Sequence, residues 1–195
     1  PTEDMWEDEE INRAKRLYKK ALRIGKDNSD VYYNIGSLYE LKNKPKKSLF
    51  WYLKILEISD QRMDILLKVS ALYEKIGDFE HWEMYLRKIV SIDPQSRNNR
   101  ILLIKMLDKT EQYKAALAEI EEYLENYPQD NEQRYLQLDI MRKMGWYEVA
   151  YSRYNDLLND KEYANDARFF IGLVKTQLDL FSTGKITNYD RAIFN

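Results

Sequence analysis

Apolar and small residues recur along the chain with the spacing of a helix face. Between residues 29 and 62 one such set is Tyr32, Ile35, Gly36 and Tyr39, and a second is Ser48, Tyr52, Ile55 and Leu56. The polar stretch 42–45 between the two sets has the composition of a turn. In the following stretch the break falls at 75–78, where Gly77 suits the left-handed position that ends a helix. The pattern therefore predicts pairs of helices joined by short turns.

This pattern repeats at a fixed interval. Pro94 and Pro128 lie 34 residues apart (128 − 94), and so do Tyr113 and Tyr147. The same separation joins Ala116 to Ala150, Tyr39 to Tyr73, and Tyr18 to Tyr52. Gly36 and Gly172 are separated by four such intervals (172 − 36 = 136). Different residue types keep one register over most of the chain, which indicates a stack of similar helical units.

The period and its anchor residues resemble the tetratricopeptide repeat. That pattern places a large residue, Leu, a small residue and Tyr on the first helix, then Gly, Tyr and Ala around the start of the second, and a closing Pro. Residues 29–62 match it with Tyr32, Ile35, Gly36, Tyr39 and Tyr52, and residues 63–96 with Leu66, Val69, Tyr73, Gly77, Phe79 and Pro94. Residues 97–130 match with Leu103, Tyr113, Ala116 and Pro128, and residues 131–164 with Gly145, Tyr147, Ala150 and Tyr154.

The resemblance implies an all-α fold, a right-handed superhelical solenoid of antiparallel helix hairpins. We expect one array over residues 1–195, with a half unit at 8–28 and full units at 29–62, 63–96, 97–130 and 131–164. Residues 165–182 are expected to form the first helix of a further unit, followed by an irregular loop at 183–188. Tyr189 and Ala192 repeat the opening of a second helix, which predicts the start of a truncated helix at 189–195.

In the tetratricopeptide family a partner peptide lies in a concave groove lined by fixed positions of the first helices. The fifth position of every unit of this chain is apolar or aromatic. Because that position is not an anchor of the stack, it is the strongest indication of a binding surface. The resemblance places the following residues in the groove as partner-binding: Tyr33, Ser37, Leu67, Ala71, Ile101, Lys105, Asp108, Tyr135, Asp139, Arg142 and Phe169.

Each of these assignments has a structural alternative. The side chains at the fifth position are equally consistent with local packing against neighbouring first helices. Acidic residues such as Asp64 and Asp166 stand at helix starts and basic residues such as Lys75 and Lys143 at helix ends, where they offset the helix dipole without any partner. Lys105 and Asp139 lie in the middle of their helices, so the dipole does not account for them.

Composition excludes several other classes of function. With 31 basic and 33 acidic side chains the formal net charge is −2, which gives no electrostatic basis for binding nucleic acid. The chain has no Cys and one His, so an ordinary zinc site cannot be built. Its 6 glycines are dispersed and form no phosphate loop. Carboxylates such as Glu119 and Glu122 belong to a charged helix surface rather than to a catalytic pair. We therefore expect neither an enzyme nor a bound cofactor.

The expected function is that of a protein–protein interaction scaffold that binds a peptide or helix of another protein in the groove. The alternative is a structural subunit that forms homo-oligomers or docks into a larger machine through its end helices and exposed aromatic residues such as Trp6, Trp51 and Trp146. No apolar run is long enough for a transmembrane segment, and no signal peptide is visible. A cytoplasmic and a periplasmic location are both compatible with the sequence. The composition is rich in Ile, Lys, Asn and Tyr, which resembles that of proteins from AT-rich genomes and suggests a bacterial source.

Overall fold

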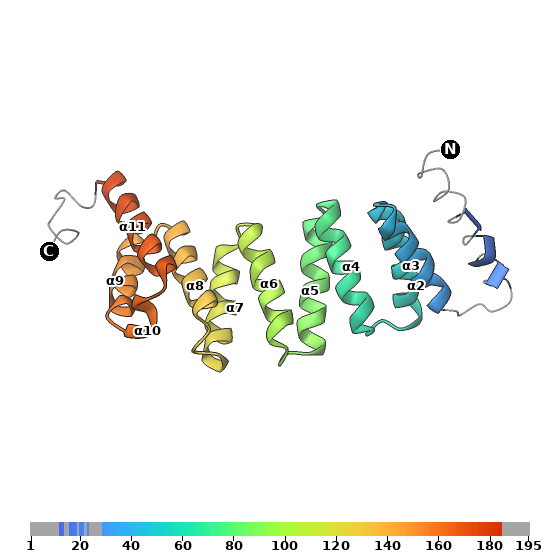
Figure 1. Cartoon of the computed structure of the whole chain (residues 1–195), viewed down its shortest axis with the longest axis horizontal. Helices are drawn as coiled ribbons and strands as arrows, with labels where there is room; N and C mark the ends of the chain where they lie inside the picture. Colours follow the sequence, from blue (N-terminus) through green and yellow to red (C-terminus); the bar gives the residue numbers. More distant parts are fainter. Residues whose placement is uncertain (1–11, 14–15, 19, 22, 24–28, 185–195) are drawn as a thin grey trace. The chain divides into compact units, whose positions relative to one another are not determined.

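A computed structural model of the chain describes residues 12, 13, 16–18, 20, 21, 23 and 29–184. Over residues 29–184 it contains ten α-helices and no strand (Figure 1). The helices are α2 (Ser29–Leu41), α3 (Pro45–Ile58), α4 (Met63–Ile76), α5 (Phe79–Ile92), α6 (Arg97–Lys109), α7 (Tyr113–Asn126), α8 (Asn131–Lys143), α9 (Tyr147–Leu158), α10 (Lys161–Ala164) and α11 (Ala167–Ser182). The predicted all-α fold is confirmed. The short helix α10 is an addition that the repeat pattern does not contain.

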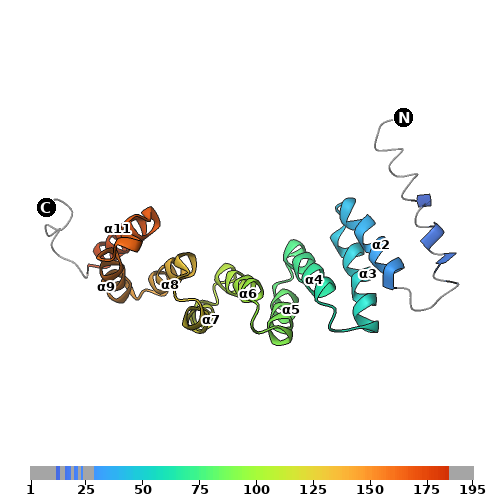
Figure 2. The same ribbon diagram turned by 60° about the horizontal axis from the view of Figure 1, so that its bottom comes forward.

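The chain divides into two compact units, Pro1–Asn99 and Arg100–Asn195, which we call the N-terminal and the C-terminal unit. In the N-terminal unit α2 packs on α3, α3 on α4, and α4 on α5 (Figure 2). In the C-terminal unit α7 packs on α8, and α8 on α9, while α11 contacts α8, α9 and α10. Within each unit every hairpin therefore buries part of its apolar surface against the next one.

Two predicted segments fall largely outside the described residues. Of the half unit expected at 8–28, the described residues, among them Leu17 and Tyr18, are helical. The helix start expected at 189–195 lies wholly outside, as does the loop at 183–188 except for its first two residues. These two expectations stay predictions.

The turn inside each hairpin contains one residue with a left-handed backbone. It occupies the same place in four successive repeats, with φ values of 51° at Asn43, 81° at Gly77, 58° at Glu111 and 78° at Gly145. Glycine adopts this conformation without steric cost and Asn tolerates it, whereas Glu collides with its own backbone there. Gly77 is thus in the conformation that its sequence context predicts, and Glu111 is held in a strained one.

Replacing the strained residue should stabilise the protein. We expect Glu111→Gly to raise the free energy of unfolding by about 0.5–1 kcal/mol, because the relief of strain exceeds the entropy that glycine adds to the unfolded chain. The matched reverse change, Gly145→Ala, should lower it by about 1 kcal/mol. Urea denaturation of both variants measures the two effects, and a loss of stability in Glu111→Gly would contradict the assignment of strain.

Two of the helix contacts depend on a glycine that faces a tyrosine ring. A Cβ atom at Gly36 would lie 2.6 Å from Cε1 of Tyr52, and a Cβ at Gly172 would lie 2.6 Å from Cε1 of Tyr154. Both distances are well below van der Waals contact, and both tyrosines are fully buried. The contact at Gly36 lies within one hairpin, between α2 and α3, whereas the contact at Gly172 joins α11 to α9 of the preceding hairpin. At both sites the absence of a side chain lets the two helices approach closely.

A methyl group at either glycine should force the helices apart. Gly172→Ala is expected to lower the free energy of unfolding by about 1–3 kcal/mol, because the tyrosine ring has no space into which to move. In a Tyr154→Leu background the added methyl group should cost measurably less, since the shorter side chain leaves room for it. Thermal or urea unfolding of the four proteins of this cycle tests the contact. Equal costs in the two backgrounds would show that the ring is not the obstacle.

Candidate functional site

In the N-terminal unit two of the predicted groove residues, Tyr33 and Ser37, contact Tyr52. The Tyr52 hydroxyl donates a hydrogen bond to the Glu40 carboxylate and lies 3.0 Å from the Ser37 hydroxyl. The Lys68 ammonium group, from the next first helix, lies 2.9 Å from the same carboxylate. It also lies over the rings of Tyr33 and Tyr52, at 5.6 Å and 5.3 Å from their centroids. One lysine therefore ties α2, α3 and α4 together at the surface of the first helices.

In these surroundings the pKa values of Tyr52 and Lys68 both lie above their ordinary values. Burial and the hydrogen bond to Glu40 raise the pKa of the Tyr52 phenol. Burial lowers the pKa of Lys68, but the interactions with Glu40 and Tyr52 raise it more, so that it lies above its ordinary value. Lys68 is therefore a fixed positive charge. Of the other predicted residues here, Tyr33, Ser37 and Leu67 are half-buried, and Ala71 is exposed.

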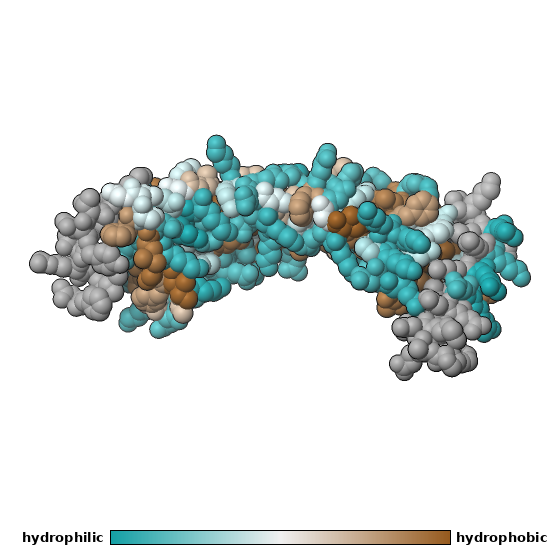
Figure 3. All heavy atoms as spheres, turned by 90° about the horizontal axis from the view of Figure 1, so that it is seen from above, coloured by the Kyte–Doolittle hydropathy of each residue, from teal (hydrophilic) through white to brown (hydrophobic). Residues whose placement is uncertain are grey.

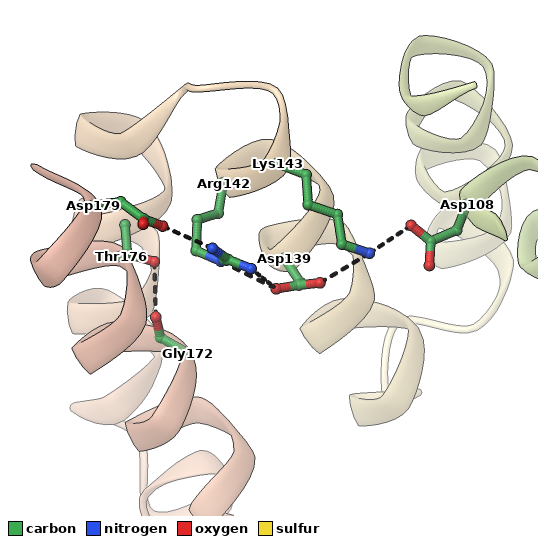
Figure 4. A network of polar contacts seen from close by, with 7 residues as sticks. All are labelled: Asp108, Asp139, Arg142, Lys143, Gly172, Thr176 and Asp179. Carbon is green, nitrogen blue, oxygen red and sulfur yellow. Dashed lines mark hydrogen bonds and ion pairs between the residues drawn. The ribbon is translucent and has the colours of Figure 1, made fainter. Parts of the chain in front are cut away.

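In the C-terminal unit charged side chains of three first helices form one network (Figure 4). Lys143 of α8 lies 2.7 Å from Asp108 of α6 and 3.2 Å from Asp139 of its own helix. Arg142 lies 3.0 Å from Asp139 and 2.7 Å from Asp179 of α11. The network brings together the predicted residues Asp108, Asp139 and Arg142. Asp179 was not predicted as their partner, because it lies outside the groove positions of the repeat.

The network is partly exposed and carries a net negative charge. Three aspartates and two bases leave a formal charge of −1 (−3 + 2). Burial lowers the pKa of Lys143, but the pairing with Asp108 and Asp139 raises it more. The pKa of Arg142 also lies above its ordinary value, because its pairing with Asp179 and Asp139 outweighs burial. Asp139 has the most covered side chain of the five, at 13% exposure, and bridges both bases. The two basic side chains are therefore oriented before any partner binds.

Phe169 does not lie on an accessible surface, contrary to its predicted place among the partner-binding residues. It is fully buried. Its ring contacts those of Tyr135, Tyr154 and Tyr163, with centroid distances of 6.0, 6.3 and 5.1 Å. Tyr163 belongs to the additional helix α10, which packs on α9 and α11. The extra helix thus converts the last member of the apolar series at the fifth position into a core residue.

The remaining predicted residues of the C-terminal unit stay accessible. Tyr135 and Ile101 are half-buried, and Tyr135 packs on the ring of Tyr154 at a centroid distance of 6.4 Å. The structural alternative of local packing therefore holds in part for Tyr135. Lys105 is 56% exposed and approaches Glu132 of α8 at 3.6 Å. We call Ile101, Lys105, Asp108, Tyr135, Asp139, Arg142 and Lys143 the inner patch.

Charged residues at helix ends divide into two groups. Asp166 caps α11 by accepting a hydrogen bond from the backbone of Arg168, and Asp64 pairs with Arg62 directly before α4. Both of these contacts are local to the start of one helix, as expected for acidic residues that offset the helix dipole. Arg142 and Lys143, also at a helix end, instead bridge neighbouring helices. The helix dipole alone therefore does not account for the contacts that these two side chains make.

Other surfaces of the described residues show fewer features of a binding site. The hollow beside the turns of the C-terminal unit, about 710 Å³, is lined by residues 111–115 together with Met144 and Trp146, whose side chain is 44% exposed. Trp51 is half-buried against Tyr32 and Phe50, and Trp6 lies outside the described residues.

Among the described residues no group of three or more His, Asp or Glu side chains is arranged to hold a metal ion. Within the same part of the chain, no helix has the length and apolar character required to cross a membrane.

Comparison with known proteins identifies the repeat. The tetratricopeptide-repeat family matches residues 29–62 and 64–96. No curated protein matches the chain. Among solved structures, YrrB, described as a tetratricopeptide-repeat protein with an unusual peptide-binding site, is similar with 18% identity and a TM-score of 0.55, over 87% of this chain and 98% of its own. MamA is similar with 18% identity and a TM-score of 0.57, over 87% and 100%. A tetratricopeptide-repeat protein from Parabacteroides merdae has 17% identity and a TM-score of 0.51, over 94% and 75%.

The network that joins α6 to α8 predicts a measurable coupling between Asp108 and Lys143. A double-mutant cycle with Asp108→Asn and Lys143→Gln should give a coupling of about 0.5–1 kcal/mol in the free energy of unfolding, because both side chains are mostly covered. The exposed pair Lys54–Glu57 serves as the control and should couple by about 0.3 kcal/mol or less. Indistinguishable couplings at the two pairs would mean that the network does not hold the helices together.

Proposed function

Because this chain is a tetratricopeptide-repeat protein, we propose that it is a protein-interaction scaffold whose inner patch binds a peptide or helix of another protein. The observation that supports this most directly is the charged network in which three successive first helices present paired, partly exposed side chains. A protein surface in which polar groups are already oriented loses less entropy when a partner binds.

The inner patch offers both kinds of contact that peptide recognition requires. Ile101 and Tyr135 supply half-buried apolar surface, which suits the side chains of a peptide. The aspartates of the network retain acceptor capacity for backbone N–H groups or for a basic side chain, because each carboxylate has two oxygens and several lone pairs. The net negative charge of the network favours a partner with a basic residue at this point.

A binding role also fits the chemistry of the carboxylates. Asp108, Asp139 and Asp179 are each paired with a base at 3.0 Å or less. Such pairing engages each carboxylate in an ion pair, whereas general acid–base catalysis needs a group positioned to transfer a proton to or from a substrate. YrrB, the similar structure described by its peptide-binding site, lends support to a peptide as the ligand class.

A pair of matched charge reversals tests the proposal. Peptides that bind the full chain are selected from a random library, and their affinities are measured by calorimetry for the wild type, Lys105→Glu and Lys114→Glu. Lys105 lies in the inner patch, whereas Lys114 lies on the second helix α7, and both side chains are exposed, so neither change should disturb the fold. Because the new carboxylate reinforces the negative charge that favours a basic residue of the partner, we expect Lys105→Glu to strengthen the binding of peptides with a basic residue about tenfold, a change of about 1.4 kcal/mol. We expect Lys114→Glu to leave their binding nearly unchanged.

The control separates a binding site from a general charge effect, because both variants alter the net charge equally. Equal changes in affinity in the two variants would mean that the peptides respond to overall charge. Unchanged binding in Lys105→Glu would place the binding site elsewhere on the chain. Circular dichroism of each variant confirms that the helices are intact.

A further inference from the structure

A hollow of about 240 Å³ lies between α8 and α9 of the C-terminal unit. Its lining residues are Arg134, Gln137 and Leu138 of α8, and Arg153, Asp156 and Leu157 of α9. The charged side chains of the lining give a formal charge of +1 (+2 − 1). Hydrophilic side chains cover much of the surface in Figure 3, so an exposed charge alone does not indicate a binding site. Arg134 differs from such surface charges, because one of its donor groups is buried.

The guanidinium group of Arg134 has a buried donor without an acceptor. Its Nη2 group donates a hydrogen bond of 2.7 Å to the backbone oxygen of Pro128. Its Nε–H group is covered by the surrounding protein and has no hydrogen-bond partner among the described residues. A buried donor of a charged side chain is unfavourable when it lacks an acceptor. The position therefore calls for an acceptor that the described part of the chain does not provide.

The preceding repeat shows which kind of acceptor an arginine at this register position receives. Arg100 of α6 lies 34 residues before Arg134 (134 − 100). Its Nη1 group lies 3.4 Å from the Glu119 carboxylate and 2.8 Å from the Glu122 carboxylate, and both glutamates belong to α7. In that repeat the arginine of the first helix is thus paired with carboxylates of the second helix.

Both carboxylates are altered in the repeat that contains the hollow. Arg153 occupies the register position of Glu119 (153 − 119 = 34), and Asp156 occupies that of Glu122 (156 − 122 = 34). Arg153 reverses the charge, and the side chain of Asp156 is shorter than that of Glu by one methylene group. As a result the Nε–H group of Arg134 receives no carboxylate, and a second guanidinium group lines the same hollow.

We propose that the hollow between α8 and α9 binds a Glu or Asp side chain of a protein partner. The partner supplies from outside the carboxylate that Glu119 supplies to Arg100 within the chain. Guanidinium groups are planar and present paired donors that match the two oxygens of a carboxylate. The positive charge of the lining favours an anionic group. The hollow shares no residue with the inner patch, whose charged network is negative, so the two sites can be tested separately.

The resonance of the Arg134 Nε–H group tests the proposal. The isotope-labelled full chain is titrated with the peptide acetyl-Ala-Ala-Glu-Ala-Ala-amide, and with the same peptide carrying Gln in place of Glu. The Glu peptide should shift this resonance until it saturates, and the Gln peptide should not. Arg153→Gln should weaken the Glu peptide at least tenfold, whereas Lys175→Gln, at an exposed site in the middle of α11, should not. Equal responses to the two peptides would overturn the proposal, as would unchanged affinity in Arg153→Gln.

Two further ligands separate the possible sources of the anionic group. Inorganic phosphate and propionate, which carries the carboxylate of a Glu side chain without a peptide, are titrated in the same way. The Glu peptide should bind more tightly than either. Tighter binding of phosphate would overturn the assignment to a carboxylate, and tighter binding of propionate would overturn the assignment to a protein side chain.

A variant that supplies the carboxylate within the chain provides an independent test. Arg153→Glu reproduces the arrangement of Arg100 with Glu119. We therefore expect it to raise the midpoint of urea unfolding and to abolish the response of Arg134 to the Glu peptide. Lys175→Glu changes the net charge by the same amount and should alter neither property. An Arg153→Glu chain that is no more stable than the wild type, or that still binds the peptide, would overturn the proposal.

Discussion

The contact between a glycine on a first helix and a tyrosine ring on a second helix sets the spacing of two helix pairs, α2 with α3 and α9 with α11. Gly36 and Gly172 leave no room for a methyl group against Tyr52 and Tyr154. At this separation the fifth-position residues Tyr33 and Tyr135 rest on the same two tyrosine rings. The surface of the first helices is thus built directly on the helix contact, and a change in the helix spacing would also displace the candidate binding residues.

The tyrosine hydroxyl at this register position has different hydrogen-bond partners in the two units. In the N-terminal unit the Tyr52 hydroxyl bonds to Glu40, which also binds Lys68. In the C-terminal unit burial raises the pKa of Tyr154, and its hydroxyl has no hydrogen-bond partner among the described residues. The polar contacts there are made instead by Asp139 and Arg142, which connect α8 to α11. The same repeat pattern therefore carries different polar contacts in the two units. The network of Asp139 and Arg142 lies in the C-terminal unit.

The 34-residue register was sufficient to predict the helix pairs and the left-handed turn at Gly77, because both follow from local spacing. It did not predict α10, since a four-residue helix leaves no periodic signal, and the burial of Phe169 depends on Tyr163 from that helix. Asp179 was missed for a related reason. Its pairing with Arg142 depends on the relative placement of α8 and α11, which the sequence of one repeat does not encode.

Contact between the inner patch of the C-terminal unit and a partner can be measured by titrating the isotope-labelled chain with a selected peptide and following the amide chemical shifts. If the proposed site is correct, the largest shifts fall on α6 and α8, around Ile101, Lys105, Tyr135 and Asp139. Shifts confined to the second helices α7 and α9 would show that the peptide binds elsewhere.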